Sequence, residues 1–303
     1  MNVKVEIGKK IKLLRKKKKL TREAFCEDEA ELTVRQLLRI ESGQSLPSLP
    51  KIQFISKQLN VPISHLIDEE YSILPHRYIE IKNSIIKTSI YGERDRIQSL
   101  EASFDELFSD YYDNLPEDEQ LFVDLQQAKM DIHFNADDLF WRSIIEDYIA
   151  QLFVKKLYNE NDLILIEVYL HYRFDKEYLP EKIYPLIETA IEQINFYLDS
   201  DALLLLRILI CAMSLFETHK DYTLFEICLR TANFIMTKHQ DYKKKPIVLM
   251  LEGKFILFSK KDSEAGIKMY QSGSTFARMI DDEFLAKKIE EELQQDLEKV
   301  KLL

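Results

Sequence analysis

The sequence predicts an all-α fold in which a short helical module is followed by a long array of paired helices. Its 303 residues include only 6 Gly and 8 Pro, too few for a turn-rich all-β chain or a low-complexity chain. Hydrophobic residues make up 46% of the chain, which is enough to form a sizeable core. Apolar residues recur at spacings of three and four along most of the chain, a pattern typical of amphipathic helices.

Charge and periodicity predict three segments: a module at residues 1–67, a linker at residues 68–77 and a body at residues 78–303. Residues 1–67 hold 14 Lys and Arg against 7 Asp and Glu, a net charge of +7, and the rest of the chain carries −17, giving −10 in all. The linker lacks periodicity and contains Pro75. A basic module attached to an acidic body is typical of a nucleic-acid reader joined to a second domain.

The module is predicted to contain five short helices. The first places Ile7, Ile11 and Leu14 on one buried face. Each of the other four begins at a residue that favours helix starts, namely Thr21, Thr33, Ser48 and Pro62. The second and third helices are joined by a tight connection, which predicts a helix-turn-helix.

The third helix, TVRQLLRIE, is predicted to read DNA. Its apolar side chains, including Leu38, are expected to pack inward and to leave Arg35, Gln36 and Arg39 outward. In the major groove, Arg forms hydrogen bonds with guanine and Gln forms them with adenine. The backbone N–H groups of a helix that starts at Thr33 can bind a DNA phosphate. The candidate DNA contacts are Thr33, Arg35, Gln36, Arg39, Arg22 and Lys10.

These residues resemble the XRE (Cro/repressor-like) helix-turn-helix family over residues 20–66. The family's characteristic tail reads here Ile40, Glu41, Gly43, Pro47, Leu49, Ile52, Ile55, Leu59, Val61 and Leu66. The resemblance implies double-stranded DNA as a partner. The alternative is a five-helix interaction module that does not touch DNA.

The body is predicted to be an α-solenoid of tetratricopeptide-like helix pairs, with an irregular all-helical domain as the alternative. Gly253 and Ala265 are spaced like the small residues at which the two helices of such a repeat touch. The expected helices are 78–90, 94–113, 117–134, 138–157, 161–173, 181–198, 201–217, 221–239, 246–259, 263–280 and 283–301. The last of these is expected to cap the solenoid, with exchange between two protomers as the alternative.

An XRE module followed by such a body resembles the peptide-sensing RRNPP regulators, and within them the ComR-type competence regulators of the Rgg branch. The similarity is carried by AELTVRQLLRIESGQSLPSL at 30–49 and more thinly by 115–119 and 161–169. It implies a receptor for a short re-imported signalling peptide, monomeric when free, that dimerises and activates genes at an inverted-repeat promoter. The alternative is an XRE repressor or antitoxin whose body binds a protein.

The residues also suggest a peptide groove. The candidate peptide contacts are Arg207, Met213, Phe216, Met250 and Lys254. Arg207 and Lys254 could form ion pairs with a peptide carboxylate. Met and aromatic residues at helical spacing are, as the alternative, ordinary residues of the hydrophobic core.

An acidic stretch suggests a switch. Residues 101–119 carry eight acids and no base, and the simplest interpretation is a solvated helix face. The sharper hypothesis is that Glu117 docks Arg35 or Arg39 in the resting state and hides the reading helix. Exposed pairs of this kind are weak, so a ligand could release them.

Several function classes are disfavoured. The three cysteines form no C-x-x-C, the six histidines lack metal-ligand spacing, and nucleotide-binding and hydrolase motifs are absent. We therefore predict no enzyme, no metal and no cofactor. The N-terminus lacks a signal-peptide core, and the apolar run at 203–216 is short for a membrane span and contains Arg207, which predicts a cytoplasmic protein.

Overall fold

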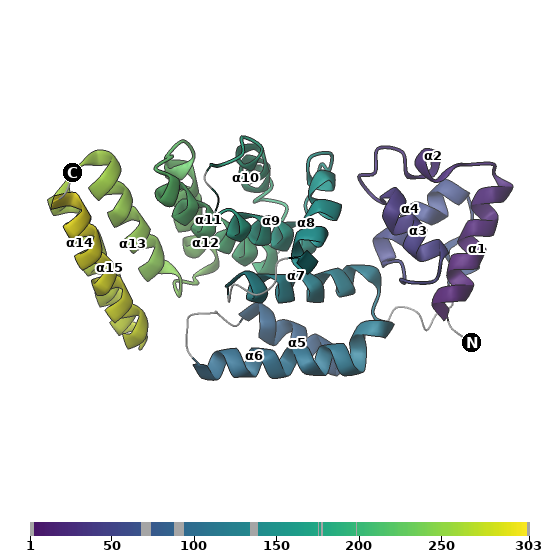
Figure 1. Cartoon of the computed structure of the whole chain (residues 1–303), viewed down its shortest axis with the longest axis horizontal. Coiled ribbons are helices and arrows are strands. Elements are labelled where there is room, and N and C mark those ends of the chain that lie inside the picture. The colour runs from purple at the N-terminus through teal and green to yellow at the C-terminus, as the bar shows by residue number, and fades with distance from the viewer. Residues whose placement is uncertain are drawn as a thin grey trace. The chain divides into compact units, whose positions relative to one another are not determined.

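The computed structural model describes residues 3–67, 74–87, 94–133, 139–174, 176, 178–197 and 199–301, and within these ranges the chain forms helices and no strand (Figure 1). The chain separates into two compact units, Met1–Leu157 and Tyr158–Leu303. This division falls inside the predicted body, so the N-terminal module shares a unit with the first four body helices. The predicted linker is too long at one end, because His76 already begins a helix, and its residues 68–73 lie outside the described ranges.

The N-terminal module contains four α-helices and one 3₁₀ turn, in place of five α-helices. They are α1 (Val3–Lys17), α2 (Arg22–Cys26), α3 (Val34–Glu41), α4 (Leu49–Leu59) and η1 (Ile63–His65). The side chains of Thr21, Thr33 and Ser48 accept backbone N–H groups at the starts of α2, α3 and α4, as their sequence positions predict. The core is formed by apolar side chains such as Ile11, Phe25, Leu37, Ile40, Ile52 and Ile55.

A glycine sets the distance between α1 and α3. A Cβ atom built on Gly8 would lie 2.1 Å from the carbonyl oxygen of Ile40, closer than any real contact. The backbones of the two helices therefore meet at this position, and only glycine fits there. This contact fixes α3 against the module from its buried side.

The other helices of the first unit begin within two residues of the predicted starts, but the last of them ends at Leu152, before the predicted end at residue 157. They are α5 (His76–Lys87), α6 (Arg94–Glu106), the π turn η3 (Leu107–Tyr111), the 3₁₀ turn η4 (Tyr112–Asn114), α7 (Glu117–His133) and α8 (Leu139–Leu152). One isolated backbone bridge joins Leu46 of the module to Pro116, just before α7. The acidic stretch therefore meets the module at the start of α7.

The second unit consists of consecutive helices that pack on their neighbours. They are α9 (Glu160–Tyr172), α10 (Ile183–Glu192), α11 (Asp199–His219), α12 (Phe225–His239), α13 (Lys245–Phe255), the π turn η5 (Ile256–Lys260), α14 (Ser263–Met279) and α15 (Glu283–Lys301). The strongest packing joins α11 to α12, α13 to α14 and α14 to α15. This is the antiparallel pairing that the amphipathic segments predict.

Helix α11 is longer than predicted. Its segment Ser200–His219 is long and apolar enough to cross a membrane by length and composition, although the most apolar part of that segment is mostly buried inside the protein. The same helix has Arg207 in an ion pair with Glu167. These contacts mark α11 as the central core helix of this unit.

The small residues between α13 and α14 differ by one position from the prediction. A Cβ on Gly266 would lie 3.2 Å from the carbonyl oxygen of Gly253, so Gly266, the residue after Ala265, makes a close approach. Helix α15 has the predicted bounds and packs against α13 and α14 of its own chain. Its buried apolar residues include Leu285, Ile289 and Leu293, whereas Phe284 is 48% exposed.

Candidate nucleic-acid interface and its contact with helix α7

The N-terminus of α3 is closed by a reciprocal pair of hydrogen bonds. The Thr33 hydroxyl accepts the N–H of Gln36 at 3.1 Å, and the Gln36 side-chain oxygen accepts the N–H of Thr33 at 2.9 Å. This capping box satisfies two of the amides that a helix start leaves open. It also holds the Gln36 side chain against the protein, where it is only 3% exposed.

The exposed face of α3 differs from the prediction in two residues. Arg35 is exposed and Arg39 is half-buried, as expected for DNA contacts, but the buried Gln36 was wrongly placed outward. Leu38, predicted to be buried, is 46% exposed. The T-x-x-Q spacing of Thr33 and Gln36 is itself a capping signal that the prediction overlooked.

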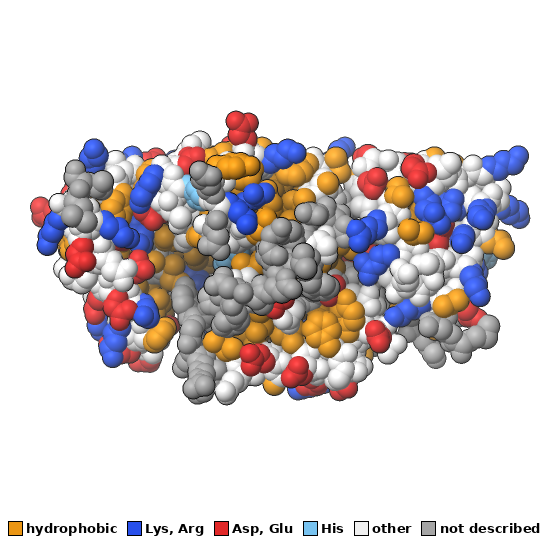
Figure 2. Space-filling model, viewed as in Figure 1, with side chains coloured by type: hydrophobic (Ala, Val, Ile, Leu, Met, Phe, Trp, Pro, Cys, Tyr) orange, Lys and Arg blue, Asp and Glu red, His pale blue; other side chains and the backbone are white. Residues whose placement is uncertain are grey.

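The other two predicted DNA contacts lie in different surroundings. Lys10 is exposed on α1, and Figure 2 shows Lys and Arg side chains gathered over the N-terminal module. Arg22 instead donates from Nε to Glu41 at 2.8 Å, so its role is structural in this conformation. Of the predicted cationic DNA contacts, Lys10 and Arg35 are thus exposed and Arg39 is half-buried.

Glu41, at the end of α3, is held by two arginines. Arg15 donates to both carboxylate oxygens, at 2.6 Å and 3.0 Å, and Arg22 adds its own bond. The Glu41 side chain is 1% exposed. Burial opposes ionisation, but the bonds from Arg15 and Arg22 outweigh it and lower the pKa of Glu41. The cluster ties α1, the start of α2 and the reading helix into one rigid piece.

Helix α7 docks on the module through a buried lysine. The Lys51 ammonium of α4 contacts Glu117 at 3.2 Å and Asp118 at 2.8 Å, and the Glu117 side chain is 1% exposed. Glu117 is therefore paired with Lys51, and its predicted pairing with Arg35 or Arg39 was wrong. Burial acts to lower the pKa of Lys51, yet the two carboxylates outweigh it and raise that pKa.

Four further hydrogen bonds strengthen this docking. The Glu117 N–H donates to the carbonyl oxygen of Leu46 at 2.6 Å. The Tyr148 hydroxyl of α8 contacts the Glu117 carboxylate at 3.3 Å. The Gln151 amide, also on α8, donates to the backbone carbonyls of Glu29 at 3.0 Å and Ala30 at 2.8 Å, within the turn that precedes α3. Helices α7 and α8 thus hold the module on both sides of its reading helix.

Arg39 faces acidic surroundings in the same arrangement. Asp124 of α7 accepts the Tyr112 hydroxyl on both carboxylate oxygens, at 2.8 Å and 2.9 Å. Burial raises the pKa of Asp124 to about 6, while the Tyr112 bond and the charge of Arg39 pull it down. Arg39 is therefore within electrostatic range of Asp124, although its first predicted partner, Glu117, is engaged elsewhere.

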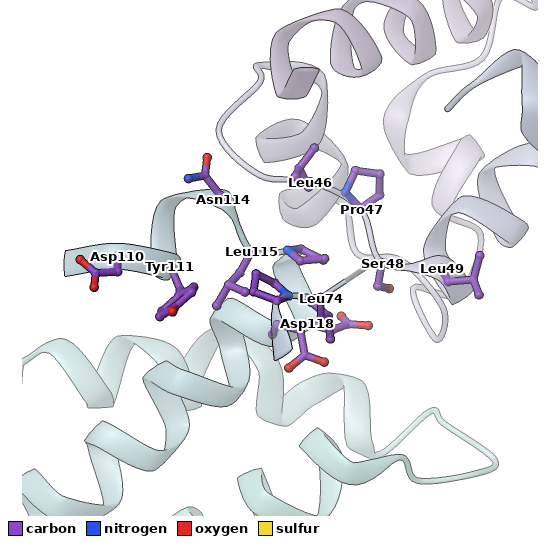
Figure 3. Close-up of a pocket in the computed structure, with 13 residues that line it drawn as sticks. Leu46, Pro47, Ser48, Leu49, Leu74, Asp110, Tyr111, Asn114, Leu115 and Asp118 are labelled. Carbon is purple, nitrogen blue, oxygen red and sulfur yellow. The ribbon is translucent and has the colours of Figure 1, made fainter. Parts of the chain in front are cut away.

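A pocket of about 370 Å³ lies beside the docked helix start. Figure 3 shows its walls, with Leu46, Pro47 and Leu49 from the module on one side and Tyr111, Leu115 and Asp118 on the other. Because its two walls come from the module and from the α6–α7 connection, the pocket keeps this form only while the two are docked.

The predicted peptide contacts are dispersed through the second unit. Met213 and Phe216 are fully buried, and Phe216 stacks on Tyr184, so both are core residues here and their assignment to an open groove was wrong for this conformation. Met250 is partly exposed. Arg207 pairs with Glu167 at 2.7 Å and keeps 17% of its side chain exposed.

Lys254 links α13 to α15 through ion pairs. Its ammonium donates to Glu292 and to the buried Asp296, each at 2.6 Å, and Asp296 also accepts the Tyr270 hydroxyl at 2.5 Å. Among the residues that the structure describes, no group of three or more His, Cys, Asp or Glu side chains could hold a metal ion.

Comparison with known proteins agrees with this architecture. Residues 75–293 match the family model "ComR tetratricopeptide", and residues 11–66 match the model "Helix-turn-helix". No curated protein sequence matches the chain.

Solved structures of ComR proteins are similar along nearly the whole chain. ComR from Streptococcus suis is 34% identical, with 98% of this chain and 96% of that chain covered and a TM-score of 0.82. The apo form of ComR from S. thermophilus is 30% identical, with 97% and 99% covered and a TM-score of 0.85. ComR from S. thermophilus in complex with DNA and its signalling peptide ComS is 30% identical, with 96% and 99% covered and a TM-score of 0.65. The chain belongs to the ComR family.

Proposed function

We propose that this chain is a cytoplasmic, peptide-sensing transcription regulator that reads an inverted-repeat promoter site with α3. The docked contact of Lys51 with Glu117 and Asp118 carries the proposal, because it ties the DNA-binding module to the body that would receive the peptide. In this state the module is held beside an acidic helix and not presented to DNA. Peptide binding would favour a second state in which α7 releases the module and two copies dimerise on the site.

The comparison with ComR structures supports a peptide-free resting state. The same S. thermophilus protein gives a TM-score of 0.85 in its apo form and 0.65 in complex with DNA and ComS, at 30% identity in both cases. Because the identity does not change, the difference reflects conformation. The structure described here is therefore closer to the apo form.

The energetics of the contact suit a switch. Leaving a buried charge without its partner would cost about 3–5 kcal/mol, but undocking lets water solvate Lys51 and both carboxylates, so the net cost is smaller. A ligand shifts such an equilibrium by the difference between its affinities for the two states. A short peptide that binds the released state more tightly would be sufficient.

Of the predicted peptide contacts, we retain Arg207 and Met250. Met213 and Phe216 would need the core of α11 to open, and Lys254 would have to leave Asp296 and Glu292. A peptide carboxylate could instead compete with Glu167 for the Arg207 guanidinium, which can bind a carboxylate with two parallel bonds. We infer no catalytic role for the chain.

The test is DNA binding at physiological salt, with and without a panel of short synthetic peptides. The probe is the inverted repeat upstream of a neighbouring competence or peptide gene. We expect binding only with an active peptide, and a loss of about tenfold or more in affinity in Arg35→Ala and Arg39→Ala, since a bidentate arginine contact to guanine is worth about 1–3 kcal/mol.

Lys57→Ala provides a matched control, because Lys57 is an exposed cation on α4 outside the proposed reading face. Tight binding that is indifferent to every peptide would contradict the proposal. It would support a constitutive XRE repressor or antitoxin whose body binds a protein.

A further inference from the structure

The reading helix exposes one large apolar side chain. Leu38 is 46% exposed, whereas Leu37 and Ile40, which belong to the same helix, are fully buried. Residues three and four apart lie on the same face of a helix, so Leu38 shares a face with Arg35 and Ser42, which are both exposed. It also immediately precedes Arg39. The apolar side chain is therefore placed beside the two arginines proposed to contact bases.

A second residue extends this apolar position toward the start of the helix. Val34 lies four residues before Leu38, is partly buried and packs on the core of the module. The module core thus continues outward through Val34 to Leu38 along α3. The helix start is fixed by the capping box and its end by the Glu41 cluster, so this face is rigid.

The chemistry of DNA limits what such a side chain can recognise. In the major groove, the edges of guanine, cytosine and adenine present hydrogen-bonding groups, and the C5-methyl group of thymine is the apolar feature. A leucine gives no hydrogen bond and would desolvate a polar edge without compensation. Packing on a methyl group instead removes apolar surface from water on both partners.

We propose that Leu38 selects a thymine in each half-site, next to the bases contacted by Arg35 and Arg39. This inference rests on the proposed function and adds sequence preference to it. Arg35 and Arg39 would supply polar contacts, and Leu38 would discriminate by the presence of one methyl group. The chemical group recognised is thus the thymine methyl, and deoxyuridine, which pairs identically but lacks it, is the matching probe.

The experiment uses the full chain and begins by selecting bound sequences from a random duplex library. Low salt, about 50 mM, strengthens protein–DNA binding enough for selection without peptide. Each thymine of the selected inverted repeat is then replaced by deoxyuridine in both half-sites, one position at a time. Affinities are measured for the wild type, Leu38→Ala and Leu38→Met. Leu13→Ala is the control, because Leu13 is a 65% exposed leucine on α1 of the same module.

We expect one thymine position to be sensitive. Losing a buried methyl group weakens binding about fourfold per half-site, or about fifteenfold for the pair. Leu38→Ala should bind thymine and deoxyuridine equally at that position, whereas Leu38→Met and Leu13→Ala should keep the preference. A wild type indifferent to deoxyuridine at every position, or a Leu38→Ala variant that keeps the preference, overturns the inference. A wild type that enriches no sequence in this selection, nor in one repeated with the peptide panel, overturns the proposed function itself, which is a distinguishable result.

Discussion

At the scale of single residues, Glu41 has the most demanding environment in the DNA-binding module. Its side chain is almost completely buried and receives bonds from Arg15 and Arg22, while Arg15 also donates to the carbonyl oxygen of Leu20 at 2.6 Å. The three side chains connect α1, α2 and α3. A carboxylate in this position is stable only because both cations are present.

We expect Glu41→Gln to destabilise the protein by about 3 kcal/mol, because it leaves two arginines without their buried counter-charge. The pKa of Glu41 is lowered from 4.5 in the folded protein, so its contribution is present at neutral pH and is lost as the pH falls through the lower, folded value. The difference between variant and wild type should therefore shrink below about pH 4. Urea unfolding from pH 3 to pH 8 measures this, with the exposed Glu31→Gln as control. Equal stability at pH 7 would contradict it.

The residues that the sequence predicted correctly are those whose environment depends on helix periodicity alone. Arg35 and Lys10 are exposed, because their neighbours at helical spacing pack inward. Gln36 and Arg22 were wrong, because each has a specific polar partner, and the pairing of Arg22 with Glu41 spans 19 residues. The spacing of apolar residues does not predict such specific hydrogen-bond and ion-pair partners. Leu38 was wrong because an eight-residue helix buries a narrow face, which Leu37, Ile40 and the partly buried Val34 already fill.

At the scale of elements, most helices begin close to the predicted positions, because caps and apolar spacing are local. Helices α8 and α10 end well before the predicted ends, at Leu152 and Glu192. Two features were missed: the π turns at the ends of α6 and α13, and the reduction of the fifth module helix to a 3₁₀ turn. The contact between α4 and α7 was predicted in part. An acidic helix start was expected to meet the module, but its partner, Lys51, lies 66 residues away along the chain and among many lysines.

Gly8 allows an element-scale prediction. Alanine usually stabilises a helix interior relative to glycine by about 1 kcal/mol. In Gly8→Ala the new Cβ would lie 2.1 Å from the Ile40 carbonyl oxygen, so α1 must move and we expect a net loss of about 2–3 kcal/mol.

Thermal unfolding compares this variant with Gly266→Ala, whose Cβ would meet its nearest neighbour at 3.2 Å. The Gly266 variant should lose much less stability. If the two variants lose the same amount, the close approach of α1 and α3 is not the cause.

At the scale of the whole molecule, the resting state should respond to a single amide substitution. Glu117→Gln removes one of the two carboxylates that neutralise Lys51 and leaves the size of the side chain unchanged. We expect DNA affinity without peptide to rise about tenfold, because the docked state loses about 1.4 kcal/mol and the released state loses nothing. Affinity at saturating peptide should not change.

Glu106→Gln is the matched control for that measurement. Glu106 belongs to the same acidic stretch and forms an ion pair with Arg77 of α5, outside the contact with the module. It should leave peptide-free DNA binding as in the wild type. Unchanged peptide-free affinity in Glu117→Gln would mean that Lys51 and Asp118 hold the module without it, or that docking does not limit DNA binding.

The docked contact also determines how the regulator responds to its own abundance. Lys51 and its two carboxylate partners belong to one polypeptide, so their effective concentration is set by the intervening chain and not by the number of molecules in the cell. The released fraction is therefore the same at low and high expression. Occupancy of an inverted repeat, by contrast, requires two copies and rises with the square of the released concentration. Below saturation, gene dosage would thus raise occupancy by the same factor with and without peptide, so the ratio between the two is set by the peptide and not by expression.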